Sequence, residues 1–117
     1  MSEPSIFSRI IAGEIPATVR YEDEQFIAIN DINPQAPVHV LLIPKHPYPT
    51  LENVPTSDTD FHAQLLLTGR KVAEKVGIAA NYKLFMNVGK NVQEVRHVHL
   101  HILGGWKSGS GHLNLDL

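Results

Sequence analysis

"HVHLHILGG" (residues 97–105) carries three of the chain's 7 histidines at alternate positions and ends on two glycines. Apolar residues occupy the positions between the histidines, so the stretch has the two-residue period of a β-strand. On such a strand His97, His99 and His101 share one face, about 6.6–6.8 Å apart at their Cα atoms, while the apolar residues face a core. The sequence therefore predicts a row of imidazoles on a rigid strand.

The composition is typical of one soluble globular domain. The chain has 117 residues, of which 43% are hydrophobic and 19% charged, and its net charge is −2. This near-neutral balance argues against DNA or RNA as a partner, because broad nucleic-acid binding requires a basic excess. The absence of cysteine excludes disulfides, thiol catalysis and cysteine-ligated zinc.

Nothing in the sequence predicts a membrane or secreted location. No apolar run approaches the roughly 20 residues of a membrane span. The opening "MSEPSIFSRI" (residues 1–10) lacks the basic start and long apolar stretch of a signal peptide. We therefore expect a cytoplasmic protein that does not associate with membranes.

Residue periodicity and turn signals predict two helices and about five strands. The expected helices run from Ser5, as N-cap, to Gly13, and from about Ser57 to Val76, with Ser57 and Asp60 resembling a capping box. The expected strands lie within residues 19–23, 26–31, 38–45, 82–88 and 97–103. Most connections are too short for parallel crossovers, so the predicted fold class is α+β, with an antiparallel sheet. We expect a single domain over residues 1–117, with its core at about 5–105 and a flexible tail at 106–117.

The histidine row has three interpretations on pattern alone. The first is an exposed strand surface that tolerates histidine. The second is a metal site, although His97 and His101 would lie about 13 Å apart on a straight strand. Bonds of about 2.0–2.1 Å to zinc favour an adjacent pair with a third ligand from elsewhere, such as His39.

The third interpretation is nucleophilic catalysis on phosphorus. A neutral imidazole is a good nucleophile near neutral pH, and flanking imidazoles can donate hydrogen bonds to phosphate oxygens and keep the middle ring uncharged. His99 has a histidine neighbour on both sides. The preceding loop supplies Asn87, Gly89 and Gln93 as neutral donors suited to phosphate. Nucleotidyl transfer explains the largest number of residues.

Several motifs together resemble the histidine triad (HIT) superfamily, and its Hint branch in particular. They are "IFSRIIAGEIPA" (6–17), "AINDINPQAPVHVLLIPK" (28–45), "MNVG" (86–89) and the triad itself, so that the resemblance spans roughly residues 5–105. It implies a HIT-like fold, a homodimer and purine nucleotide binding. It also implies hydrolysis of nucleoside phosphoramidates and related AMP or GMP conjugates through a nucleotidyl-histidine intermediate. We expect no metal or other cofactor, because three histidines on one straight strand would chelate a metal only with strain and the chain has no cysteine.

The same resemblance assigns roles to the histidines. His99 matches the nucleophile, and His101 matches the histidine that contacts the α-phosphate. His97 matches the residue that helps to orient the nucleophile, and His39 matches a supporting histidine on the preceding strand.

A nucleotide pocket is also implied. Asp31 matches the acidic residue that holds the ribose hydroxyls, but it is equally suited to forming the turn before "NP". The apolar walls of the base pocket match Phe7, Ile10 and Ile32, for which a purely structural role in the core is the alternative. Polar residues at the phosphate match Asn87 and Gln93.

Two departures from the animal Hint proteins bear on substrate choice. Glu94 replaces a serine near the leaving group, in a loop that is one residue shorter, and the tail "WKSGSGHLNLDL" (106–117) differs. The leaving group is therefore not implied by the resemblance. Two other functions stay open, namely a nucleotide-binding or protein-interaction module with incidental hydrolysis, and a dinucleoside polyphosphate hydrolase.

Overall fold

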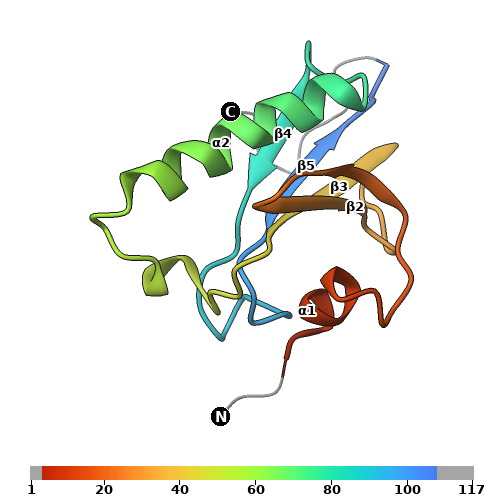
Figure 1. The fold of residues 1–117 in the computed structure, drawn as a ribbon. Helices are drawn as coiled ribbons and strands as arrows, with labels where there is room; N and C mark the ends of the chain where they lie inside the picture. The colour runs from red at the N-terminus through yellow and green to blue at the C-terminus, as the bar shows by residue number, and fades with distance from the viewer. Residues whose placement is uncertain (1–3, 108–117) are drawn as a thin grey trace.

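The computed structural model describes residues 4–107. Its strands form one five-stranded sheet in the order β1-β2-β3-β5-β4, and every neighbouring pair is antiparallel (Figure 1). The strands are β1 (Val19–Glu22), β2 (Phe26–Asn30), β3 (Val38–Pro44), β4 (Tyr82–Phe85) and β5 (Leu100–Gly104). The helices are α1 (Ile6–Ile11) and α2 (Thr59–Lys75), with a short 3-10 turn, η1 (Leu51–Asn53), in the loop before α2. The predicted α+β class, with about five antiparallel strands and two helices, is confirmed.

The two helices cover opposite faces of the sheet (Figure 1). On the α2 face, side chains from β2, β3 and β5 pack with Leu65, Val72 and Ala73 of the helix. On the α1 face, Phe7 packs with isoleucine and leucine side chains of β2 and β3. The central strand β3 is buried along almost its whole length, as expected for a strand that is covered on both faces.

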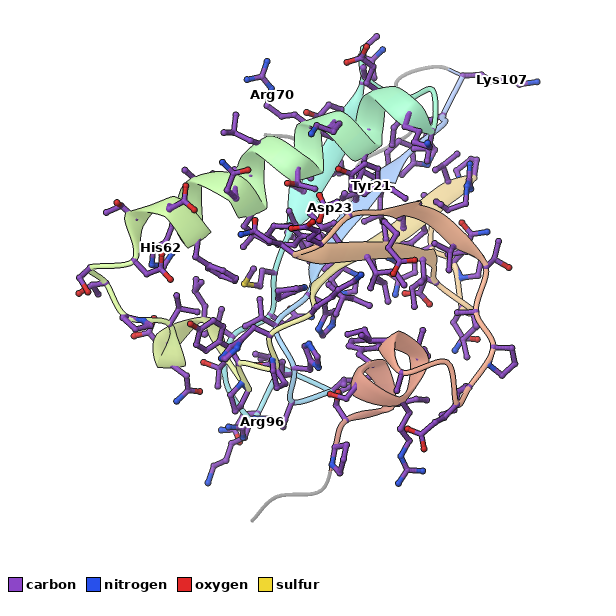
Figure 2. The ribbon with its side chains drawn as sticks, in the orientation of Figure 1. Tyr21, Asp23, His62, Arg70, Arg96 and Lys107 are labelled. Atoms are coloured by element: carbon purple, nitrogen blue, oxygen red, sulfur yellow. The ribbon has the colours of Figure 1, made fainter. Side chains whose placement is uncertain are left out.

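The hairpin between β1 and β2 is closed by one aspartate. Asp23 accepts hydrogen bonds from the backbone N–H groups of Gln25 and Phe26 and from the Tyr21 hydroxyl, the last at 2.7 Å. Tyr21 and Asp23 lie side by side below α2 (Figure 2). Asp23 therefore closes the turn and ties its tip to the first strand.

Helix α1 begins and ends as its sequence predicts. The Ser5 side chain accepts a hydrogen bond from the Ser8 N–H at 3.0 Å, which satisfies one of the free donors of the first turn. Gly13, just beyond the helix, has φ of 80°, a conformation that glycine adopts at little cost.

The start of α2 differs from the prediction. Its N-cap is Asp58, whose carboxylate accepts from the Phe61 N–H at 3.0 Å, and not Ser57. Asp and Ser are about equally good caps, so two adjacent candidates cannot be ranked by residue type. The buried residues of α2 include Leu65, Thr68 and Val72.

The triad segment is only partly a strand. β5 begins at Leu100, so His101 lies in the sheet while His97 and His99 precede it. The reason is that pairing with β3 ends at Leu100 and pairing with β4 ends at His101, which leaves no ladder partner for the earlier residues. The expectation of three histidines on one continuous strand is therefore wrong.

The predicted flexible tail falls largely outside the described residues, since the structure does not describe 108–117. Within residues 4–107 neither helix combines the length and the apolar character that crossing a bilayer requires.

Candidate active site

Four histidines gather on the face of the sheet that α1 covers. His39 lies on β3, His101 lies beside it on β5, and their ring centroids are 5.2 Å apart. The His99 ring lies 5.1 Å from that of His101. The Phe7 ring of α1 meets the rings of His97 and His99 edge-on, at 5.9 and 5.0 Å. The structure thus brings together the four histidines that the sequence predicted as catalytic.

One nitrogen of His99 is fixed and the other is free. Nδ1 lies 2.8 Å from the carbonyl oxygen of His97, and since a carbonyl only accepts, Nδ1 must carry the proton. In the neutral ring the lone pair then belongs to Nε2. Nε2 has no hydrogen-bond partner within residues 4–107. Every buried side-chain nitrogen or oxygen in these residues does have a partner, so Nε2 is not buried and reaches the surface. His99 therefore presents an accessible lone pair on an oriented ring.

The His97 ring is held inside the protein. Nε2 donates to the Pro44 carbonyl at 2.8 Å, and Nδ1 accepts from the Ser5 hydroxyl at 2.7 Å. The side chain is fully buried, with an exposed fraction of 0%. The expectation that imidazoles on both sides of His99 donate to phosphate oxygens is therefore wrong for His97, which reaches the nucleophile through its main-chain carbonyl.

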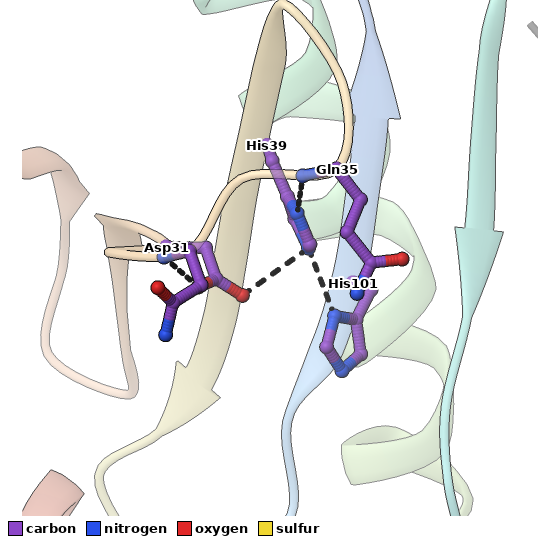
Figure 3. A network of polar contacts seen from close by, with 5 residues as sticks. Asp31, Gln35, His39 and His101 are labelled. Atoms are coloured by element: carbon purple, nitrogen blue, oxygen red, sulfur yellow. Dashed lines mark hydrogen bonds and ion pairs between the residues drawn. The ribbon is translucent and has the colours of Figure 1, made fainter.

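A second chain of hydrogen bonds sets the proton of His101 (Figure 3). The backbone N–H of Gln35 donates to Nδ1 of His39 at 3.1 Å, so the proton of the neutral His39 ring is on Nε2. That N–H faces Nδ1 of His101 at 3.0 Å and Oδ2 of Asp31 at 3.4 Å. His101 consequently accepts at Nδ1 and carries its own proton on Nε2, as a donor for an incoming ligand.

Burial keeps these histidines neutral. It is the main cause that lowers the pKa of His39, His97 and His99. Burial, followed by the neighbouring His99 and His39, lowers the pKa of His101 to about 4. For His99 burial is the largest cause of the lowered pKa. The negative charges of Asp31 and Glu94 act in the opposite direction on its pKa.

The geometry bears directly on the metal interpretation. Asp31, His39 and His101 offer ligand atoms within 4.8 Å of one another, a set that excludes His97 and His99. A metal ion on Nε2 of His39 would need the ring proton on Nδ1, where the Gln35 N–H already donates. The hydrogen bond from Gln35 therefore favours a proton on Nε2 of His39, the atom that would bind the ion.

The residues predicted to hold the nucleoside fall into two groups. Asp31 accepts from the Asn33 N–H at 2.8 Å, as a turn-forming residue does, while its second oxygen faces His39. Ile32, which follows it, has an exposed side chain, with an exposed fraction of 90%. Phe7 is buried at 6% exposure and Ile10 is partly buried, so both also belong to the core beneath α1.

The loop predicted to hold the phosphate is organised by its own glutamine. Gln93 donates through its amide to the carbonyls of Pro49 and Val95, at 2.7 and 2.8 Å, and accepts from the Gly89 N–H at 3.0 Å. The amide N–H groups of Gln93 and the backbone N–H of Gly89 are therefore already used in hydrogen bonds within the protein. Contact of these two residues with phosphate stays a prediction. Asn87 is half-buried and Glu94 is exposed.

Three contributors to the site were not predicted. The Phe85 ring stacks on His101 with centroids 4.4 Å apart and planes 9° from parallel. The Gln35 N–H and the Pro44 carbonyl fix ring protons as described above. Hydrogen bonds of backbone groups cannot be predicted from residue types. The ring stack could have been predicted only from the strand register, which pairs Phe85 with His101.

Comparison with known proteins gives a consistent result. The HIT domain family model matches residues 12–108. A HIT-like protein of Synechocystis is 51% identical over 90% of this chain and 93% of its own length. The purine nucleoside phosphoramidase of Escherichia coli K12 is 42% identical over 90% of each chain.

A solved structure agrees with these relatives. The HIT family hydrolase of Legionella pneumophila superposes with a TM-score of 0.83 at 41% identity, covering 92% of this chain and 98% of that one. The matched span holds the whole histidine cluster. On sequence and structure alike, this chain belongs to the HIT domain family.

Proposed function

We propose that the protein hydrolyses purine nucleoside phosphoramidates and related AMP or GMP conjugates through a nucleotidyl intermediate on His99. The observation that carries the proposal is the state of this ring, with its proton held on Nδ1 and an accessible lone pair on Nε2. A binding module would not need an oriented nucleophile. The similarity to a purine nucleoside phosphoramidase at 42% identity supports the substrate class.

In the first step, Nε2 of His99 attacks the α-phosphorus of the substrate. An N–P bond forms to the ring while the P–N bond to the leaving group breaks, and the departing amine takes up a proton from solvent. The ring becomes positively charged because it still carries the proton on Nδ1. The His97 carbonyl, 2.8 Å away, stabilises this charge by accepting that N–H more strongly.

In the second step, water attacks the same phosphorus and the N–P bond to His99 breaks. The nucleoside monophosphate leaves and Nε2 recovers its lone pair. In both steps the Nε2–H of His101 donates to a non-bridging oxygen, a charge-assisted bond at the position where negative charge accumulates. The stack on Phe85 keeps the His101 ring in position for this contact.

The nucleoside is proposed to lie over the exposed Ile32, with Asp31 accepting from the ribose hydroxyls. Phe7 and Ile10 then support the base pocket from α1, and Asn87, Gly89 and Gln93 border the phosphate. Glu94, which is exposed in the same loop, is proposed to face the leaving group. The proposed form is a cytoplasmic homodimer.

Steady-state turnover of the purified protein tests this function. Adenosine and guanosine 5′-phosphoramidates should be hydrolysed faster than a dinucleoside polyphosphate offered at equal concentration. A preference for the dinucleoside polyphosphate would favour the other hydrolase reaction of the superfamily. Nucleotide binding without turnover of any of these compounds would favour a binding module.

A further inference from the structure

The N-cap residue of α1 lies in direct contact with the histidine whose carbonyl orients the nucleophile. Ser5 and His97 are 92 positions apart in the chain, yet Oγ of Ser5 lies 2.7 Å from Nδ1 of His97. We propose that Ser5 is a positioning residue for the nucleophile, which acts by fixing the His97 ring and so the carbonyl that orients His99. This inference rests on the proposed function of His99.

The direction of each hydrogen bond follows from its partners. The Ser5 oxygen already accepts from the Ser8 N–H, so its own proton is available for Nδ1 of His97. His97 must accept there, because its Nε2 proton is donated to the carbonyl of Pro44. The Ser8 hydroxyl, at 3.5 Å from the same Nδ1, is too distant to replace Ser5.

Burial makes this contact costly to lose. The exposed fraction of His97 is 0%, so Nδ1 depends on the serine hydroxyl, and not on solvent, for its hydrogen bond in the folded protein. A positive charge on the ring is disfavoured as well, because burial lowers its pKa. The ring would have to move or turn in order to satisfy the freed nitrogen.

Movement of the ring would reach the nucleophile because the main chain there is not held by the sheet. β5 begins at Leu100, and the carbonyl of His97 is the acceptor for Nδ1–H of His99. The His97 ring, anchored by Ser5 on one side and by Pro44 on the other, therefore fixes the peptide that carries this carbonyl. It does so together with the backbone hydrogen bond from the Val98 N–H to the Tyr48 carbonyl at 2.8 Å. Phe7, two residues after Ser5, contacts both rings and couples α1 to the same unit.

The competing explanation is that Ser5 serves only as the N-cap of α1. Three substitutions separate the two roles. Ser5→Thr keeps the hydroxyl, Ser5→Val has the shape of threonine without the hydroxyl, and Ser5→Gly lacks the hydroxyl but is tolerated at an N-cap almost as well as serine. Asp58→Ala, which removes the cap of α2 far from the histidines, is the matched control for loss of a cap.

The first measurement needs no substrate. Nitrogen NMR of the imidazoles should find His97 with its proton on Nε2 and His99 with its proton on Nδ1 in the wild type, Ser5→Thr and Asp58→Ala. Ser5→Val and Ser5→Gly should shift the His97 Nδ1 resonance and mix the two proton positions of His99. Unchanged His97 and His99 resonances in Ser5→Gly and Ser5→Val would overturn the proposal.

The second measurement is kinetic. Ser5→Val and Ser5→Gly should lower kcat about 10- to 100-fold with KM nearly unchanged, as expected for a misplaced reacting group. Ser5→Thr should restore kcat. Wild-type kcat in Ser5→Gly would reduce Ser5 to a helix cap. If no phosphoramidate is turned over by the wild type but the NMR changes occur, the positioning role stands and the proposed function fails.

Discussion

The carbonyl oxygen of His97 accepts the Nδ1 proton of His99 across 2.8 Å, and the His97 ring is fully buried with hydrogen bonds to Ser5 and Pro44. Two adjacent members of the triad thus differ in kind. One supplies a backbone acceptor from a buried side chain, and the other presents a ring nitrogen, Nε2, that has no hydrogen-bond partner within residues 4–107. In the third member, His101, the position of the ring proton is set by the separate series of hydrogen bonds through Gln35 and His39.

Turnover should be independent of metal ions. The Gln35 N–H directs the ring proton of His39 to the nitrogen that would bind a metal in the cluster with Asp31 and His101. We expect kcat to survive exhaustive chelation with EDTA. Loss of activity on chelation, restored by added zinc, would contradict both the protonation pattern and the role of His99 as nucleophile.

Asp31→Asn should weaken recognition of ribose. The substitution keeps the shape and the turn, since an amide oxygen can also accept from the Asn33 N–H, but it removes the charge that strengthens hydrogen bonds from vicinal hydroxyls. We expect a higher KM for ribonucleotide substrates and a smaller preference over the 2′-deoxy analogues. An unchanged preference would leave Asp31 with its turn role and its contact to His39.

Acid should destabilise the protein through the buried histidines. Their folded-state pKa values are lowered by burial from about 6.5, so below that pH the unfolded chain binds more protons than the folded one. The contribution of these histidines to the free energy of unfolding is complete above about pH 6.5 and is lost as the pH falls. For His101 this loss continues down to its folded-state pKa of about 4.

Urea unfolding at about pH 7.5 and about pH 5 measures this effect. The free energy of unfolding should fall toward pH 5, and His101→Gln should lose less over the same interval than the wild type. Because carboxylates also titrate in acid, the difference between the two proteins is the informative quantity. Equal losses in both would show that His101 does not carry a lowered pKa.

The protein should form a homodimer that covers one sheet edge. β4 is the edge strand on one side, and the nearby α2 exposes Leu66 and Leu67, with exposed fractions of 55% and 50%. Pairing across a two-fold axis would cover both features. Sedimentation at micromolar concentration should give a dimer, and Leu67→Glu should shift it toward monomer. A monomeric wild type would contradict this prediction.

The fold followed from local patterns to a large extent. The strands of residues 19–45 were predictable from alternation and prolines, and the Ser5 cap from residue type. The true start of β5 was not, because it depends on where β3 and β4 stop pairing with it. The cap of α2 was misassigned because Ser57 and Asp58 are equivalent by propensity.

The gathering of the four histidines was likewise predictable, while their protonation was not. The pattern in "HVHLH" (97–101) identifies which residues gather, but the proton on His97 is set by Pro44, 53 positions earlier in the chain. Gln35 acts through a backbone N–H that every residue except proline possesses. Such contacts are visible only once the chain is folded.

The most direct test of the account is to trap the nucleotidyl intermediate and locate it. Rapid quench of the enzyme with a phosphoramidate labelled in the nucleotide should leave label on His99, in an acid-labile and base-stable N–P linkage. His99→Ala should abolish both adduct and turnover, whereas His101→Ala, which loses one donor to a phosphate oxygen, should cost roughly 10²–10³ in kcat. Label on His97 or His101, or near-native turnover by His99→Ala, would contradict the assignment of His99 as the nucleophile.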